Sequence, residues 1–227
     1  MQQQQLLPLP DGLPTFGRAL ETLNDIVPVI LKGLENGAYK ASAYRDQECP
    51  SEPLDAGFAA SILRFHSSRL IKTIGSDFQL EDWIEDSMPF MGMSFYYRKY
   101  HVRILKGPNG ELPGCSDSDK KKRFYNQLPS LYLIGTETIK SECNVIVLWN
   151  FGANYTLEQL RLALPARGAS RAENVSAYWN EAIPYSAEAT APSAPPSSNE
   201  GPGGDGMDGL IKSNETKKEN EGESNVR

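Results

Sequence analysis

The chain has 227 residues, a formal net charge of −6 and 39% hydrophobic residues. This length predicts one folded domain. The sequence has no apolar run of about 18 residues, which excludes a predicted membrane-spanning helix, and its first residues lack the features of a secretory signal. The three cysteines (Cys49, Cys115 and Cys143) form no Cys-x-x-Cys pair, which argues against a disulfide scaffold or a zinc site. We therefore expect a cytoplasmic protein that uses no metal or other cofactor and does not bind membranes.

The charge and composition divide the chain into three parts. Residues 1–14 are rich in Gln and Pro and are predicted to be flexible. Residues 185–227 have a net charge of −4 and include a stretch rich in Pro, Ser, Ala and Gly, so they are predicted to form a disordered acidic tail. Residues 15–184 remain as a single domain.

Two helices are predicted at the start of this domain. From Phe16 onward, apolar residues recur at three- and four-residue spacing, which is typical of a helix that ends at Gly37. Pro28 lies inside this pattern and predicts a kink or break near Val27. A second helix is predicted from about Leu54 to Ile74, closed by Gly75. The apolar side of this second helix is expected to contain Phe58, Ile62, Phe65, Leu70 and Ile74.

The pattern then changes to one typical of strands. Residues 92–107 alternate and are rich in β-branched and aromatic residues, which predicts a hairpin turning near Arg98 and Lys99, or one long bent strand. Residues 107–119 have the composition of a loop. A short polar helix is predicted to follow, with Ser118 or Asp119 as its cap.

Residues 144–165 form the most strongly patterned stretch. The first half is apolar on both sides, as in a strand that is covered on both faces. Residues 156–164 are ambiguous: Thr156 and Gln159 fit a helical capping box, whereas alternating leucines fit a strand. We favour the strand, which pairs the two halves as a hairpin. With residues 92–106 it makes a four-stranded antiparallel sheet, and the predicted fold class is α+β, with two N-terminal helices packed on a small, mainly antiparallel sheet.

Catalytic signals in the sequence are weak. Residues 81–86 contain four carboxylates, and the two histidines are His66 and His101, but no second ligand stands at a metal spacing and no glycine-rich phosphate loop is present. We interpret the carboxylates as a solvated turn and the histidines as structural. An uncharacterised enzyme using these groups is kept as an alternative.

The region from residue 98 to residue 125 combines basic and aromatic residues and has a local net charge of +5. Such a patch can contact phosphates while its rings stack on bases. The same pattern also fits a solvated helix face above core aromatics, or a surface for an acidic partner protein. The candidate binding residues are Arg98, Lys99, Arg103, Lys120, Lys121, Lys122, Arg123 and Tyr125.

The predicted tail contains one apolar island formed by Met207, Leu210 and Ile211. These side chains are suited to docking on another protein or on the domain, although a tail that only confers solubility is an alternative. Together the patterns predict a non-enzymatic binding protein, regulatory or accessory in kind, that acts through an unidentified protein partner. The first alternative is a nucleic-acid-binding module that uses residues 98–125.

Overall fold

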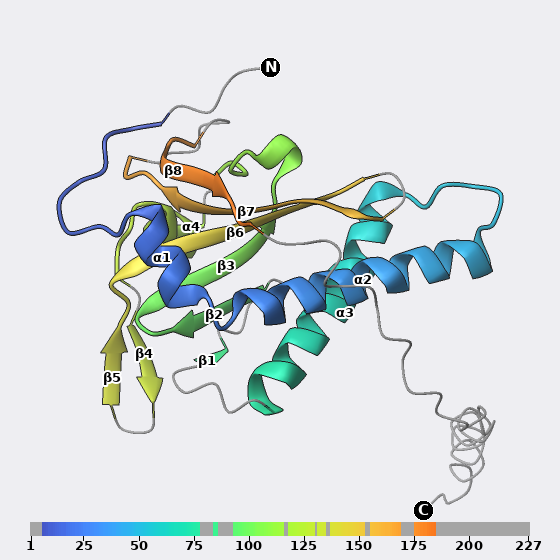
Figure 1. Cartoon of the computed structure of the whole chain (residues 1–227), viewed down its shortest axis with the longest axis horizontal. Coiled ribbons are helices and arrows are strands. Elements are labelled where there is room, and N and C mark those ends of the chain that lie inside the picture. Colours follow the sequence, from blue (N-terminus) through green and yellow to red (C-terminus); the bar gives the residue numbers. More distant parts are fainter. Residues whose placement is uncertain are drawn as a thin grey trace, which may run out of the picture. The chain divides into compact units, whose positions relative to one another are not determined.

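A computed structural model describes residues 6–77, 84–85, 93–115, 118–129, 131–134, 137–152, 155–168 and 175–184. The chain divides into two units, residues 1–185 and 186–227, and all described residues belong to the first. The tail predicted over 185–227, with Met207, Leu210 and Ile211, lies outside the described residues. Three helices begin the chain, as Figure 1 shows: α1 (Phe16–Leu23), α2 (Val27–Glu48) and α3 (Ala56–Asp77). None of the described helices is long and apolar enough to cross a membrane.

The helices are followed by a mixed sheet, which confirms the α+β class and the position of the helices before the sheet. Its strand order is β1-β2-β3-β6-β7-β8. The strands are β1 (Ile84–Glu85), β2 (Met93–Tyr97), β3 (Tyr100–Lys106), β6 (Cys143–Phe151), β7 (Leu157–Pro165) and β8 (Ala177–Ala182). Two further strands, β4 (Leu131–Ile134) and β5 (Glu137–Lys140), pair separately with each other.

Both predicted hairpins are confirmed, and they lie in one sheet that is mainly antiparallel, as predicted; the expectation that all four strands are antiparallel is wrong. Tyr97 pairs with Tyr100 across the first hairpin, and Val147 pairs with Leu162 across the second, so residues 157–165 are a strand and not a helix. Between the hairpins, however, β3 and β6 are parallel. The connection between them contains a short 3-10 turn (Pro108–Gly110) and α4 (Asp119–Tyr125), and a connection of this length can return the chain to the same end of the sheet.

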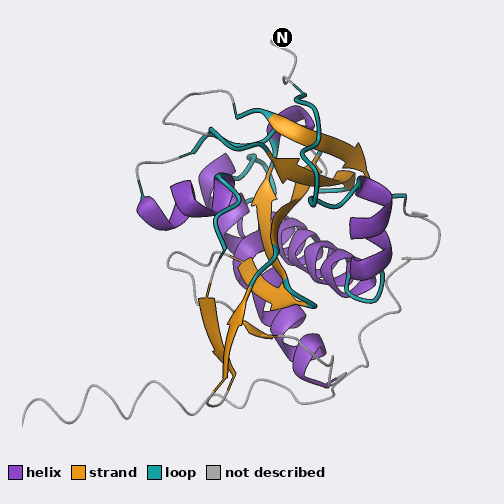
Figure 2. Cartoon of the chain, turned by 90° about the vertical axis from the view of Figure 1, so that its left-hand side faces the viewer, coloured by secondary structure: helices purple, strands orange, loops and turns teal. Residues whose placement is uncertain are grey.

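The sheet is covered on both faces. Alternate residues such as Val145 and Val147 face the core that includes α1, α2 and α3, whereas Ile146 and Leu148 face a second core with Phe124 of α4. Figure 2 shows helices on both sides of the strands. This explains why β6 is apolar on both of its faces.

The break predicted near Val27 is confirmed, with Pro28 in the first turn of the second helix. α1 ends at Leu23, and Pro28 lies in the first turn of α2, where a missing N–H costs nothing. The predicted end at Gly37 is wrong because α2 continues to Glu48. Gly37 lies against α3: a Cβ atom there would be 2.5 Å from the carbonyl oxygen of Leu63 and closer still to Ser67 Oγ. This glycine therefore brings two helices together instead of ending one.

The predicted apolar side of α3 is only partly right: Ile74 is buried and Leu70 packs against the core, whereas Phe58 and Phe65 are exposed. Asp55 caps the helix by accepting hydrogen bonds from the N–H groups of Gly57 and Phe58 at 2.9 and 3.0 Å, and Gly75 lies inside the helix. The face that is buried consists of Ala59, Leu63, Ser67, Ile71, Ile74 and Gly75. Phe58 and Phe65, expected inside, are exposed on the opposite side.

The segment before α1, predicted to be flexible, is packed along the sheet edge from residue 6 onward. Leu6 forms a parallel bridge with Ala177 of β8, and the N–H of Leu7 donates to the carbonyl of Ala177 at 2.8 Å. The indole N–H of Trp179 donates to the carbonyl of Pro14 at 2.9 Å. Residues 6–14 are therefore part of the domain and protect the edge of β8.

Candidate interaction surface

The rings of the predicted basic–aromatic patch are in the core. All five aromatic residues between 96 and 125 are buried: Tyr96, Tyr97, Tyr100, Phe124 and Tyr125. Tyr125 donates its hydroxyl hydrogen to the carbonyl of Pro113 at 2.8 Å, and burial raises the pKa of Tyr125 above its usual range. Stacking any of these rings on a base would require the domain to open.

The cations of that patch lie in separate places. Arg103 is buried, with its guanidinium 4.1 Å from the centre of the Phe124 ring. Arg98 and Lys99 form the turn between β2 and β3 and are paired with Asp25 at 3.0 Å and Glu142 at 2.7 Å. The remaining candidates, which are exposed or half-buried on α4, are Lys120, Lys121, Lys122 and Arg123. Asp25 lies between α1 and α2, so the Arg98 ion pair and α4 are on opposite faces of the sheet.

The two histidines have different surroundings. His101 is buried, with Nε2 2.8 Å from Ser94 Oγ, its ring stacked on Tyr96 at 4.4 Å and its edge against Phe124. His66 lies half-buried on α3. Its pKa is lowered by burial and then by the charges of Lys40 and Arg69.

Side chains that could bind a metal ion do not gather in the described ranges. Among those residues, no group of three or more His, Cys, Asp and Glu side chains could hold a metal ion. Burial raises the pKa of Cys143 to about 12, which keeps this thiol protonated near neutral pH. The acidic cluster at 81–86 lies outside the described residues except for the backbone of Ile84 and Glu85 in β1.

A different basic and aromatic surface is formed by the helical hairpin of α2 and α3. Three of its rings are substantially exposed: Tyr44 by 39%, Phe58 by 46% and Phe65 by 45%. Tyr44 and Phe58 meet edge to face across the two helices, with ring centres 5.4 Å apart. We define the hairpin surface by these rings and the polar residues beside them: Lys40, Tyr44, Phe58, Phe65, His66 and Arg69.

The helix seam explains why these rings face outward. Gly33 and Gly37 of α2 lie against Ile71, Ser67 and Leu63 of α3, so the small residues of one helix receive the aliphatic residues of the other. α3 therefore carries two apolar stripes at helical spacing, and only one of them can face α2. The stripe that includes Phe58 and Phe65 is left exposed.

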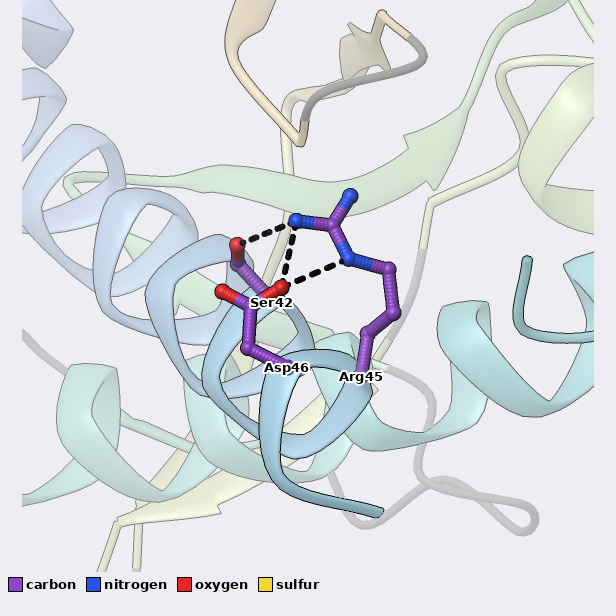
Figure 3. Close-up of polar contacts among 3 residues, drawn as sticks. All are labelled: Ser42, Arg45 and Asp46. Atoms are coloured by element: carbon purple, nitrogen blue, oxygen red, sulfur yellow. Dashed lines mark hydrogen bonds and ion pairs between the residues drawn. The ribbon is translucent and has the colours of Figure 1, made fainter. Parts of the chain in front are cut away.

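The last turns of α2 are joined to the sheet by Arg45. Its Nε and one terminal nitrogen donate to Asp46 Oδ1 at 2.9 and 2.7 Å, and the same terminal nitrogen lies 3.5 Å from Ser42 Oγ, as Figure 3 shows. The guanidinium also lies 5.4 Å from the centre of the Tyr155 ring, in the connection between β6 and β7. Asp46 is thus already paired with a cation of its own helix.

The hairpin surface was not predicted from the sequence, although a signal for it is present. The spacing of Ala59, Leu63, Ser67 and Ile71 marks a second stripe that fits the small residues of α2 better than Phe58 and Phe65 do. The chain matches no protein-family model, and no curated protein or solved structure is significantly similar to it. Its function has to be inferred from its own geometry.

Proposed function

We propose that this chain is a non-enzymatic, protein-binding protein of a regulatory or accessory kind, and that it holds its partner on the hairpin surface. The observation that carries this proposal is the exposure of Tyr44, Phe58 and Phe65 on one helical hairpin. Aromatic residues and Arg are enriched in the cores of protein interfaces and among the residues that dominate binding energy. Arg69 lies one helical turn from Phe65, so the hairpin surface combines exposed aromatic rings with an Arg, as such interfaces do.

The energetic argument favours a partner. Complete burial of one Phe side chain contributes about 1.5–3 kcal/mol relative to leaving it exposed. Phe58 and Phe65 obtain only part of this within the chain, because each remains nearly half exposed. A partner that covers both rings gains the remainder, and the rigid α2–α3 seam means that little backbone entropy is lost on binding.

Site-specific photo-crosslinking in cells of the native source tests this function. A photoreactive phenylalanine derivative replaces Phe58 or Phe65 in two variants, and Leu128 in a third. Leu128 is the matched control because it is also an apolar side chain with 45% exposure, and it follows α4 on the opposite face of the sheet. We expect a defined protein adduct from positions 58 and 65 and none from 128.

The double variant Phe58→Ala with Phe65→Ala provides the second arm of this experiment. Both residues are exposed, so we expect the variant to fold as the parent does while co-purification of the crosslinked protein falls by at least tenfold. The proposed function is wrong if no adduct forms at 58 or 65, or if position 128 gives the same adduct with the same yield.

A further inference from the structure

Resting on the proposed function, we infer that the hairpin surface binds an acidic segment of its partner protein, one with apolar side chains for Phe58 and Phe65 and carboxylates for Arg69 and Lys40. The charge of α3 is the first evidence. Between Ala56 and Ser76, α3 contains three cations (Arg64, Arg69 and Lys72) and no carboxylate. A partner with carboxylates gains attraction along this helix, whereas a basic partner is repelled.

Both helices place a cation next to the exposed rings. Lys40 of α2 and Arg69 of α3 both act on His66, whose pKa they lower in addition to the effect of burial. Lys40 and Arg69 are themselves exposed. Arg69 lies one helical turn from Phe65, whose ring centre is 5.1 Å from that of His66, and Lys40 lies one turn from Tyr44. Each helix therefore places a cation beside one of the exposed rings.

The order of groups along α3 describes the partner further. Phe58 and Phe65 are two turns apart, about 10 Å at 1.5 Å per residue, and Arg69 lies about 6 Å beyond Phe65. Along α3, the surface thus changes from an aromatic side chain near the connection with α2 to a cation further along the helix. A complementary segment has apolar residues and carboxylates one to two helical turns apart.

The same order disfavours two other occupants. A single-stranded nucleic acid is bound along a positively charged groove that follows its backbone, whereas the defining residues include only two cations, Lys40 one turn from Tyr44 and Arg69 one turn from Phe65. A second copy that placed its own α3 against this α3 would bring like charges together, because α3 has no carboxylate between Ala56 and Ser76.

Charge reversal in the photo-crosslinking variants tests the inference. The adduct from position 65 is compared in the full-length chain, in Lys40→Glu with Arg69→Glu, and in Lys120→Glu with Lys121→Glu on α4. We expect the first reversal to lower adduct yield at least tenfold and the second to change it less than twofold. Circular dichroism melting confirms that both variants fold. If the adduct persists in Lys40→Glu with Arg69→Glu, the acidic partner is excluded while the proposed function stands; if the parent gives no adduct, both fail.

Fluorescence anisotropy with defined probes tests the chemistry directly. The probes are two 18-residue helical peptides with the same leucine positions, one with Glu and one with Lys elsewhere, and an 18-nucleotide oligothymidylate. We expect only the Glu peptide to bind the parent chain. Its affinity should fall at least tenfold in the variant Phe58→Ala with Phe65→Ala, and it should also fall as the salt concentration rises. The inference is overturned if the Lys peptide binds as tightly as the Glu peptide, or if the oligothymidylate binds in a way that depends on Arg69. It is also overturned if no peptide binds and sedimentation shows that the chain dimerises in a way that depends on Phe58.

Discussion

Gln127 completes the hydrogen bonding of β6 where the neighbouring strand cannot. Asn144 lies two residues before Ile146, which pairs with Ala163, so it stands opposite Pro165, a residue without an N–H group. The side-chain amide of Gln127 donates to the carbonyl oxygens of Asn144 and Pro165 at 2.7 and 3.1 Å, and it accepts from the N–H of Asn144 at 2.9 Å. One buried side chain thus satisfies three backbone groups.

Replacing Gln127 by Ala is expected to destabilise the domain strongly. The change leaves buried backbone groups without partners, each at a cost of about 1–3 kcal/mol, so we expect a loss of about 3 kcal/mol in the free energy of unfolding. Urea denaturation measures this. Leu128→Ala is the neighbouring control, and because this side chain is exposed it should change stability by less than about 0.5 kcal/mol. Equal midpoints for the two variants would show that the amide of Gln127 does not support β6.

At the scale of elements, the contact between α2 and α3 depends on glycine. Both Gly33 and Gly37 are buried in the seam, and a Cβ atom at either position would overlap α3. The close approach that these residues permit holds α3 in the rotation that buries Leu63 and Ile71 and exposes Phe58 and Phe65. The hairpin surface is therefore a consequence of the seam.

Gly37→Ala and Gly17→Ala are expected to change stability in opposite directions. Alanine favours a helix over glycine by about 1 kcal/mol. At Gly37 this gain is outweighed by overpacking against Leu63 and Ser67, which typically costs about 1–3 kcal/mol or more. At Gly17 of α1, a Cβ atom would meet no atom within 4 Å, so only the helical preference remains. Thermal melting should show a lower melting temperature for Gly37→Ala and an unchanged or higher one for Gly17→Ala. A stabilised Gly37→Ala variant would contradict the close seam.

At the scale of the whole molecule, the core of the described residues is complete within the first unit. Its two clusters lie on the two faces of the sheet and extend from Ala19 to Ile183. The packing of residues 6–14 against β8 adds contacts at the edge. Folding should therefore depend on the N-terminal segment and not on residues 186–227.

Truncation after Tyr185 tests this and the proposed role of the tail. We expect the truncated chain to unfold at the same urea concentration as the full chain, because every core residue described is retained. It remains a prediction that Met207, Leu210 and Ile211 form a second contact with a partner. If it is right, Leu210→Ala with Ile211→Ala weakens capture of the crosslinked protein as much as the truncation does. Unchanged capture by both would leave the tail without a binding role.

Local patterns in the sequence were sufficient for the elements of the fold. Pro28 predicted the break between α1 and α2, the alternation around Arg98 and Lys99 predicted the first hairpin, and the two-sided apolar run at 144–151 predicted a strand covered on both faces. The candidate site could not be predicted in the same way. The pattern around residues 98–125 indicated a basic and aromatic surface, yet its rings are core residues. The prediction failed because proximity in sequence does not specify which face of a strand is covered by α4.

What the sequence by itself determined is the α+β class and the position of each hairpin, because these depend on periodicity and on local turns. Only the tertiary structure decided the parallel pairing of β3 with β6, which depends on how a long connection crosses the sheet. It also decided which of the two apolar stripes on α3 is buried. Both stripes satisfy the helical period, and the choice was made by Gly33 and Gly37 on another helix, where the absence of a side chain allows Leu63 and Ile71 to approach and leaves Phe58 and Phe65 to the solvent.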